Sequence, residues 1–452
     1  MRQRLAAGPV LGAAFLAVAA CHGLQADDWP QWMGPRRDGV WREAGATGTI
    51  PAGGLPVKWR AEVKGGYSGP AVAGGRVYVT DYDRRQGELA NAPNDRTQLQ
   101  GSERVLCFDA SSGKLLWKYE QEVPYSISYA AGPRCTPTVV DGKVFCVGAE
   151  GNLVCLDAQT GRLLWARDFK KDYAAPTPIW GFCGHPLVEG DALICLVGGP
   201  GSVAVAFDRH TGKELWRALS ASEAGYCPPT MIESAGVRQL LIWDADNLNS
   251  LDATTGKPFW SQPLKPMYGM SIMAPQVADT TAGRVLFASG IGRVAALYKL
   301  DAAQPAASLL WRGEPKSAVY CANSTPFIEG DTLYGCDCDT GMLTAVDLAT
   351  GGRLWETTAP TMGGARRGKH GTAFLVRHPA GGPGRTWIFS ETGDLILARL
   401  TPEKYEELGR MHLLDPTNEC FGRDVVWSHP AFAGRCIFAR NDRELVCVSA
   451  AE

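Results

Sequence analysis

The stretch CTPTVVDGKVFCVGAEGNLVCLDAQTGRLLW, residues 135–165, decides the fold because it contains one whole repeat. Three turn signals, Asp141-Gly142, Glu150-Gly151 and Gln159-Thr160-Gly161, separate four short runs of apolar and β-branched residues. Turns of this kind join neighbouring antiparallel strands. The stretch therefore predicts a meander of four antiparallel strands.

The end of this unit recurs along the chain at intervals of 44 to 51 residues. The copies are CFDASSGKLLW ending at Trp117, CLDAQTGRLLW at Trp165, AFDRHTGKELW at Trp216, SLDATTGKPFW at Trp260, the degenerate KLDAAQPAASLLW at Trp311, and AVDLATGGRLW at Trp355. A period of this length indicates an array of one supersecondary unit. Because a lone meander cannot bury both faces, we predict an all-β fold in which the units repeat radially as the blades of a β-propeller.

Each copy except the degenerate one places an Asp and a Gly in its last turn, and all six place a Trp on the outer strand. The carboxylate can accept backbone N–H groups in the turn, and the glycine allows a positive φ. We expect the Trp to fill the wedge between blades, so that Trp165 and Trp216 are largely buried. The structural positions of the repeat are Asp109, Trp117, Asp157, Gly161, Trp165, Asp208, Gly212, Trp216, Asp252, Gly256, Trp260, Trp311, Asp347, Gly351 and Trp355.

Counting the repeats predicts eight four-stranded antiparallel blades. A seventh unit, without its Trp, runs from Gly371 to Leu408-Gly409, and WSHPAF, RCIFAR and RELVCVSA then supply only three strands. We predict that residues 55–63, with Trp59 in the register of the other Trp residues, form the missing outer strand and close the ring, which removes exposed sheet edges. The alternative is seven blades, with irregular final strands.

Composition and charge exclude several classes of protein. The chain has 452 residues and 45% hydrophobic residues, which excludes a largely disordered chain. Lys and Arg total 45 against 47 for Asp and Glu, a net charge of −2, so no nucleic-acid partner is expected. We predict a single propeller domain over residues 55–452 and a monomer.

The first residues are typical of a bacterial signal peptide. Arg2 and Arg4 precede an apolar run of about eleven residues, too short to span a bilayer at about 20 residues. One interpretation is a signal peptide over residues 1–26; the other removes residues 1–20 and lipidates Cys21, which would associate the protein with the outer membrane. Both predict an exported protein, periplasmic or extracellular.

Two further segments lie outside the repeats. Residues 27–54 form an N-terminal extension, and we expect its part from Asp27 to Ala46, with Trp29, Trp32 and Trp41, to pack across the propeller exterior. Residues 84–103 are polar and without periodicity, which predicts a surface excursion within the first blade.

Fourteen cysteines are present. An exported protein can form disulfides. The best local candidate joins Cys146 to Cys155, because a two-residue turn at Glu150-Gly151 would place them opposite each other.

The LDAxTGxxLW corner resembles the tryptophan-docking repeat of the pyrroloquinoline-quinone (PQQ) propeller superfamily, over residues 57–450. That superfamily includes quinoprotein alcohol dehydrogenases and BamB-type outer-membrane assembly lipoproteins. DWPQWMGPRRDGVWREAG (28–45) and GYSGPAVAGGRVYV (66–79) also resemble the start of secreted PQQ-repeat proteins of planctomycetes. The resemblance implies the fold but does not fix the function.

The dehydrogenases that the chain resembles carry two adjacent cysteines, a Glu, Asn and Asp set for calcium and, in some, a Cys-x-x-Cys-His haem site. The sequence has no Cys-Cys pair and no haem motif, and Asn323, Glu419 and Asp424 do not match the calcium set in spacing. We therefore expect no cofactor; PQQ with calcium is the alternative. We predict a binding or assembly scaffold for a protein or small-ligand partner, against the alternative of a quinone- or metal-dependent oxidoreductase.

The residues before the inner strands should ring one mouth of the central channel. His185, His370, His429 and Asn323 fall there, and Arg367 lies in a Gly-rich loop that could hold an anion, so these are the candidate cofactor-binding residues. The candidate metal ligands are His185, His370, His429 and Cys183, because imidazole and thiolate groups bind zinc or copper. The other interpretation is a narrow tunnel filled by small residues and water. No catalytic residue is identified.

Overall fold

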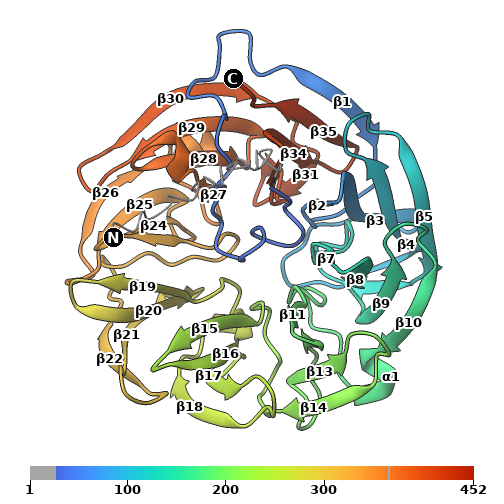
Figure 1. Cartoon of the computed structure of the whole chain (residues 1–452), viewed down its shortest axis with the longest axis horizontal. Helices are drawn as coiled ribbons and strands as arrows, with labels where there is room; N and C mark the ends of the chain where they lie inside the picture. Colours follow the sequence, from blue (N-terminus) through green and yellow to red (C-terminus); the bar gives the residue numbers. More distant parts are fainter. Residues whose placement is uncertain (1–26, 365–366) are drawn as a thin grey trace, which may run out of the picture.

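Eight four-stranded antiparallel sheets stand side by side around a central axis in a computed structural model that describes residues 27–364 and 367–452 (Figure 1). Each sheet is one blade, and its first strand in the chain lies nearest the axis in seven of the eight. The predicted signal peptide, with Cys21, lies outside the described residues.

The first four blades follow the repeat from inner to outer strand. They are β2 (Ala71–Ala73), β3 (Arg76–Gln86), β4 (Thr97–Asp109) and β5 (Leu115–Glu122) in blade 1; β7 (Thr138–Val140), β8 (Lys143–Val147), β9 (Asn152–Asp157) and β10 (Leu163–Asp168) in blade 2; β11 (Leu187–Glu189), β12 (Ala192–Leu196), β13 (Ala204–Asp208) and β14 (Glu214–Ala218) in blade 3; and β15 (Thr230–Ser234), β16 (Val237–Trp243), β17 (Asn247–Asp252) and β18 (Pro258–Pro263) in blade 4.

Blades 5 to 8 complete the ring. They are β19 (Gln276–Thr280), β20 (Gly283–Gly290), β21 (Val294–Leu300) and β22 (Ala307–Arg312) in blade 5; β23 (Phe327–Glu329), β24 (Thr332–Asp337), β25 (Met342–Asp347) and β26 (Arg353–Thr357) in blade 6; β27 (Ala373–Arg377), β28 (Arg385–Ser390), β29 (Asp394–Leu400) and β30 (Tyr405–His412) in blade 7; and β33 (Ala431–Ala433), β34 (Cys436–Arg440), β35 (Glu444–Ser449) and β1 (Val57–Glu62) in blade 8.

The remaining elements are short and lie between or beside the blades. They are β6 (Tyr125–Ile127), which pairs with β4, the hairpin β31 (Asn418–Cys420) and β32 (Arg423–Val425), the helices α1 (Phe169–Tyr173) and α2 (Ala359–Met362), and the 3-10 turns η1 (Met267–Gly269) and η2 (Pro379–Gly381). No helix in the described part of the chain is long and apolar enough to cross a bilayer.

The N-terminal strand closes the ring, as the sequence predicts. β1 pairs with β35 near the other end of the chain, and Trp59 stands opposite Cys447. The eight-blade prediction is confirmed, and the seven-blade alternative is wrong because the last three strands form a regular sheet with β1.

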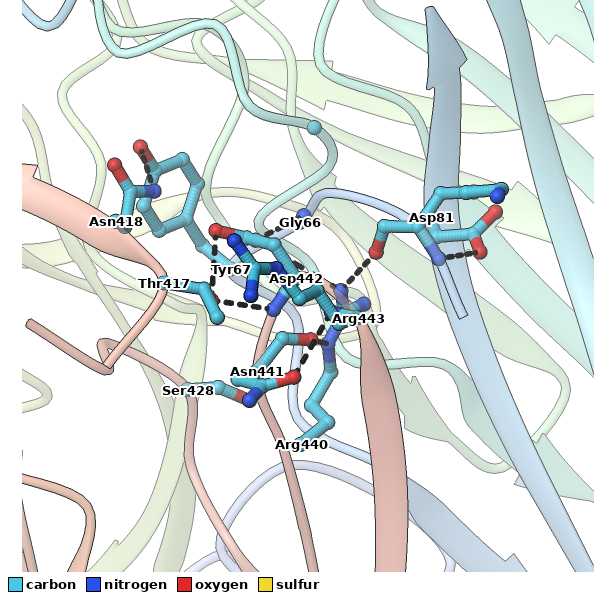
Figure 2. Close-up of polar contacts among 12 residues, drawn as sticks. Gly66, Tyr67, Asp81, Thr417, Asn418, Ser428, Arg440, Asn441, Asp442 and Arg443 are labelled. Atoms are coloured by element: carbon cyan, nitrogen blue, oxygen red, sulfur yellow. Dashed lines mark hydrogen bonds and ion pairs between the residues drawn. The ribbon is translucent and has the colours of Figure 1, made fainter. Parts of the chain in front are cut away.

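A buried cation binds blade 8 to blade 1 at this closure (Figure 2). The guanidinium of Arg440, which has no exposed surface, donates to the carbonyl oxygens of Thr80, at 2.8 Å, and Lys64. Asp442 lies 4.0 Å from this guanidinium and accepts the N–H of Gly66 at 2.9 Å. The turn between β34 and β35 is thereby bound to the chain that enters blade 1.

Outer-strand tryptophans connect each blade to the next. The indole N–H groups donate to carbonyl oxygens in the next blade: Trp59 to Ala110 at 2.9 Å, Trp117 to Ala158 at 3.1 Å, Trp165 to Arg209 at 3.2 Å, Trp216 to Ala253 at 3.0 Å, Trp311 to Leu348 at 2.8 Å and Trp355 to Thr401 at 2.9 Å. Trp216 is buried as predicted, but Trp165 is only half-buried.

The corner residues have the predicted roles. The Asp157 carboxylate accepts the hydroxyl and the N–H of Thr160, each at 2.8 Å, and these bonds hold the pKa of Asp157 below its usual value. Gly161 has φ +72°, and a Cβ there would lie 2.5 Å from the Trp117 ring. The corner therefore needs glycine both for its backbone and for the ring that covers it.

Two contacts depart from this pattern. The corner before β22 lacks the Thr-Gly pair, and the indole N–H of Trp260 donates instead to the Gln239 side chain of its own blade, at 3.2 Å. Blade 7 has Gly409 in place of the Trp, and Ile50 of the N-terminal extension packs there: a Cβ on Gly409 would lie 3.0 Å from its Cβ.

The predicted Cys146–Cys155 disulfide is wrong. Cys146 stands opposite Val154, and Cys155 opposite Phe145, so the two thiols lie on different faces of the sheet. The reason is the turn. The N–H of Gly148 donates to the carbonyl of Asn152, and the carbonyl of Gly148 accepts the N–H of Gly151. The loop is therefore longer than two residues, and the register of the two strands shifts by one. All thirteen cysteines in the described residues are free.

The segment 84–103 also differs from the prediction. β3 continues to Gln86 and β4 begins at Thr97, so half of the segment is strand and only residues 87–96 form a loop. Pairing of β6 with β4 supports this long hairpin beside the mouth of the channel.

A pair of glycine substitutions isolates the contact between blades. Gly161→Ala and Gly142→Ala impose the same backbone strain, about 1–2 kcal/mol, because both residues have φ +72°. A Cβ at Gly142 meets nothing within 4 Å, whereas one at Gly161 meets Trp117. We expect Gly161→Ala to lower the free energy of unfolding by about 1–3 kcal/mol more than Gly142→Ala in urea titrations. Equal losses would contradict the docking role.

Candidate functional site at the channel mouth

A cavity of about 770 Å³ opens at the end of the channel where the inner strands begin. Its volume lies in the usual range of small-molecule sites. Of the residues singled out in the sequence, Cys183, His185, Asn323, His370 and His429 lie on its wall.

Arg367 lies outside this wall. Its side chain is exposed and its guanidinium lies 3.8 Å from the carboxylate of Glu356. The arginine is therefore engaged on the surface of blade 6, away from the cavity.

The floor of the cavity is Trp32 of the N-terminal extension. The prediction that this extension packs across the exterior is wrong, because it crosses the middle of the ring (dark blue in Figure 1). The indole is 3% exposed and stacks on His185, with ring centroids 4.8 Å apart and an interplanar angle of 11°. The edge of the His429 ring meets it at 5.8 Å. The extension thus gives the cavity a closed end.

Backbone bonds hold the extension between inner strands of distant blades. Trp29 exchanges two backbone hydrogen bonds of 2.8 Å with Val72 of β2, and the carbonyl of Pro30 accepts the N–H of Val139 in β7. On the other side of Trp32, the N–H of Trp41 donates to the last residue of β27, at 2.8 Å. Blades 1, 2 and 7 therefore fix the position of the floor.

A buried cation lies against the floor. The Arg37 guanidinium lies 5.4 Å from the centroid of the Trp32 ring. It donates to the carbonyl oxygens of Pro186, His185 and Pro229 at 3.0, 3.2 and 3.4 Å, which come from the entries to blades 3 and 4. Burial lowers the pKa of Arg37 to about 10, so the side chain stays charged at neutral pH.

The two histidines beside Trp32 are neutral at pH 7. His185 accepts the N–H of Thr136 at Nδ1, at 2.9 Å, which places its proton on Nε2. Burial holds the pKa of His185 well below its usual value, and the charge of Arg37 acts in the same direction. Burial also lowers the pKa of His429 to about 3.

His370 belongs to another part of the wall. Its ring stacks on Phe421, at the tip of the β31–β32 hairpin, with centroids 4.9 Å apart. Its backbone carbonyl accepts the side-chain N–H of Asn323 at 3.4 Å. Burial lowers the pKa of His370.

The candidate metal ligands are not brought together. Within residues 27–364 and 367–452, no three His, Cys, Asp or Glu side chains converge as a metal site. Cys183 donates its thiol to the carbonyl oxygens of Trp180 and Gly181 at 3.6 and 3.5 Å, and burial raises the pKa of Cys183 to about 11. The wall thus presents the thiols of Cys183 and Cys338 and separated imidazoles.

The residues also do not fit the quinone and calcium pair that the superfamily suggests. Calcium takes six to eight oxygen ligands, including carboxylates. Asp339 is the one carboxylate on the described wall, and it is paired with Arg293 at 2.8 Å. Glu391, behind the wall, accepts from Arg423 at 2.9 Å and from the Trp427 indole at 3.1 Å.

Nine aromatic side chains line the wall, and the sequence reasoning missed them as a group. They are Trp32, Tyr67, Tyr129, Trp180, Tyr226, Tyr268, Phe374, Phe421 and Trp427. Tyr67, Tyr226 and Trp427 each stand directly before the small residues that enter an inner strand, in YSGP, YCPP and WSHP, and this adjacency was the available signal. The Asn418 side chain donates to the Tyr67 hydroxyl at 2.8 Å and orients it (Figure 2).

Comparison with known proteins identifies the repeat. The family model described as outer membrane protein assembly factor BamB matches residues 101–357 and 244–452. No curated protein matches the sequence.

Similar solved structures include BamB from Moraxella catarrhalis, with a TM-score of 0.53 and 15% identity over 86% of this chain and 98% of that one. The quinohemoprotein alcohol dehydrogenase from Comamonas testosteroni gives a TM-score of 0.63 and 13% identity over 94% and 80%. A europium-containing methanol dehydrogenase gives 0.60 and 13% over 93% and 89%. At these identities the likeness shows the fold alone.

The buried histidines make stability depend on pH. Because the pKa of His429 is about 3 when folded and about 6.5 when unfolded, the unfolded chain binds more protons between these values, and stability falls as pH falls. We expect His429→Gln to reduce the slope of the unfolding free energy against pH by up to about 1.4 kcal/mol per pH unit between about pH 6 and 4. Urea titrations at several pH values measure it. An unchanged slope would contradict burial of a neutral imidazole.

Proposed function

This chain belongs to the family described as outer membrane protein assembly factor BamB, and we propose that it is an exported binding protein whose site is the mouth cavity. The observation that carries the proposal is the cavity itself, about 770 Å³ in volume, lined by aromatic side chains and closed at its floor by Trp32. We place its action in the periplasm or outside the cell, on the signal-peptide pattern of residues 1–26.

The state of the polar wall residues supports binding over catalysis. A catalytic site needs a nucleophile or base within reach of a substrate and with a suitable protonation state. Here Cys183 is a protonated thiol, His185 is engaged at Nδ1, and Asp339 is paired with Arg293. Each group is already committed to a neighbour or lacks the needed charge.

Exposed apolar side chains at the rim also support binding. Met267, Tyr268 and Phe421 are 50%, 66% and 49% exposed, and all three line the opening. Exposed apolar surface gathered around a cavity is typical of a ligand or partner site. Leu163 and Leu354 are also exposed, but they lie on outer strands around the ring.

Substitutions at the rim test the site. A thermal-shift screen of chemically diverse small molecules should yield ligands that raise the melting temperature of the wild type. We expect Tyr268→Ala and Phe421→Ala to weaken binding of those ligands by about tenfold, because each removes an apolar contact at the opening. Leu163→Ala and Leu354→Ala are matched controls with similarly exposed apolar side chains on outer strands.

The pattern across the four variants decides the proposal. If the leucine substitutions weakened ligand binding and the rim substitutions did not, binding would lie on the outside of the ring. That result would overturn the mouth assignment. A screen with no stabilising compound would also count against it.

A second result follows because no calcium ligand set is found among the described residues. Supplied with PQQ and calcium, the protein should reduce no redox dye upon addition of primary alcohols, because the wall offers no free carboxylate pair to hold the metal. Dye reduction that requires both the alcohol and the quinone would overturn the non-catalytic proposal.

A further inference from the structure

We propose that Cys436 and Cys447 form a redox-active dithiol that exchanges with small organic disulfides. The pair lies in blade 8, on the strands that close the ring, and it is independent of the mouth cavity and of the function proposed there. The proposal is argued from the register of the strands, from a cation held against one thiol and from a difference in burial between the two.

The two thiols are neighbours on one face of the sheet. Cys436 stands opposite Ser449, and Phe438 stands opposite Cys447, so the two cysteines occupy diagonal positions on paired strands. Side chains two residues apart point to the same face, and diagonal neighbours can touch. Both thiols are free, and each acts on the ionisation of the other. The arrangement therefore differs from the pair in blade 2, whose thiols lie on opposite faces.

A cation lies against one thiol of the pair. Lys58 Nζ is 3.7 Å from Cys436 Sγ. Lys58 is a bulged residue, since the register of β1 shifts between Val57 and Trp59. In the other seven blades the bulged residue of the outer strand is apolar: Leu116, Leu164, Leu215, Phe259, Leu310, Leu354 and Leu408. Blade 8 is also the one blade whose second strand begins with a cysteine. It thus departs from the repeat at both contacting positions.

The two thiols differ in burial and in charge. Cys436 is 6% exposed, whereas Cys447 has no exposed surface. The hydrogen bond from Cys447 and the charge of Lys58 lower the pKa of Cys436 to about 7, although burial and the charge of Glu43 act in the opposite direction. The same contact raises the pKa of Cys447. Cys436 is therefore partly a thiolate at pH 7, which is the form that attacks disulfides, and a protonated thiol lies beside it.

The other described cysteines lack this combination. Burial raises the pKa of each of them. The Arg76 guanidinium lies 3.8 Å from the Sγ of Cys107, yet the pKa of Cys107 is raised to about 11. A cation alone is therefore not sufficient. A reachable thiolate next to a second thiol is typical of an attacking and a resolving cysteine.

The exchange proceeds in two balanced steps. The Cys436 thiolate attacks one sulfur of the small disulfide, and a mixed disulfide forms as the S–S bond of the reagent breaks and its other half leaves as a thiolate. Cys447 then loses its proton to solvent and attacks the sulfur of Cys436, which releases the second half as a thiolate. Two thiols of the protein are oxidised to one disulfide, and one small disulfide is reduced to two thiols.

Peptide mapping by mass spectrometry tests the proposal on the mature protein. The native protein is incubated at pH 7 with excess glutathione disulfide and then alkylated. We expect the wild type to form the Cys436–Cys447 disulfide before any other cysteine reacts, and Cys447→Ser to stop at a glutathione adduct on Cys436. Cys107→Ser is the matched control and should react as the wild type does. Lys58→Met should slow the first step about threefold, because the thiolate fraction falls more than its nucleophilicity rises.

The wild-type result decides the proposal even where a variant does not fold. A glutathione adduct that persists on wild-type Cys436 would show a lone reactive thiol and overturn the dithiol. Modification that begins at another cysteine, or no modification under these conditions, would overturn the site altogether. An unchanged rate in Lys58→Met would overturn the role of the cation. None of these outcomes depends on a ligand of the mouth, so this proposal and the proposed binding function are tested separately.

Discussion

Pairing of the first strand with the last is the constraint on which the rest of this molecule depends. β1 supplies the outer strand of blade 8, so the two ends of the chain meet in one sheet and the outer edge of β35 is paired. The same pairing fixes the position at which the N-terminal extension joins the ring. The extension before β1 must run beneath blades 7 and 8, and it reaches the axis from there, where Trp32 and Arg37 meet the entries to the inner strands. Closure of the ring and closure of the channel are therefore two results of one connection.

The contacts between blades follow a local rule that can be recognised in the sequence. A Trp on one outer strand covers the Gly of the next corner and donates to a carbonyl beside it, so residues at a fixed spacing identify both partners. This is why the fold, the number of blades and the closing strand could be predicted from the repeat. The rule also explains its own exception: where the corner after Trp260 lacks its Gly, the indole turns back to Gln239 of its own blade. Blade 5 is joined to blade 4 by other contacts, among them a bond from Gln262 to the Ala307 carbonyl at 2.8 Å.

The site was predictable only in part, because it depends on residues outside the repeat. The order of strands indicates which residues ring the mouth, and His185, His370 and His429 do lie there. Sequence spacing does not give the distance across the channel, so it could not show that only two of these imidazoles share the Trp32 ring. The floor was missed because the extension has no periodicity and makes its contacts with six blades, namely 1, 2, 3, 4, 7 and 8. A register change of one residue in a single turn was likewise enough to separate Cys146 from Cys155.

The closed floor affects how molecules can pass through the central channel. A propeller with an open channel can exchange molecules at either end, and its two faces communicate through the axis. Here the indole of Trp32 stands across the axis, with the Arg37 side chain packed against it and tied to three carbonyl oxygens. A molecule that enters the mouth must leave by the same opening. Tyr268 and Phe421 lie at this opening, so a ligand of the mouth would pass them both on entry and on exit.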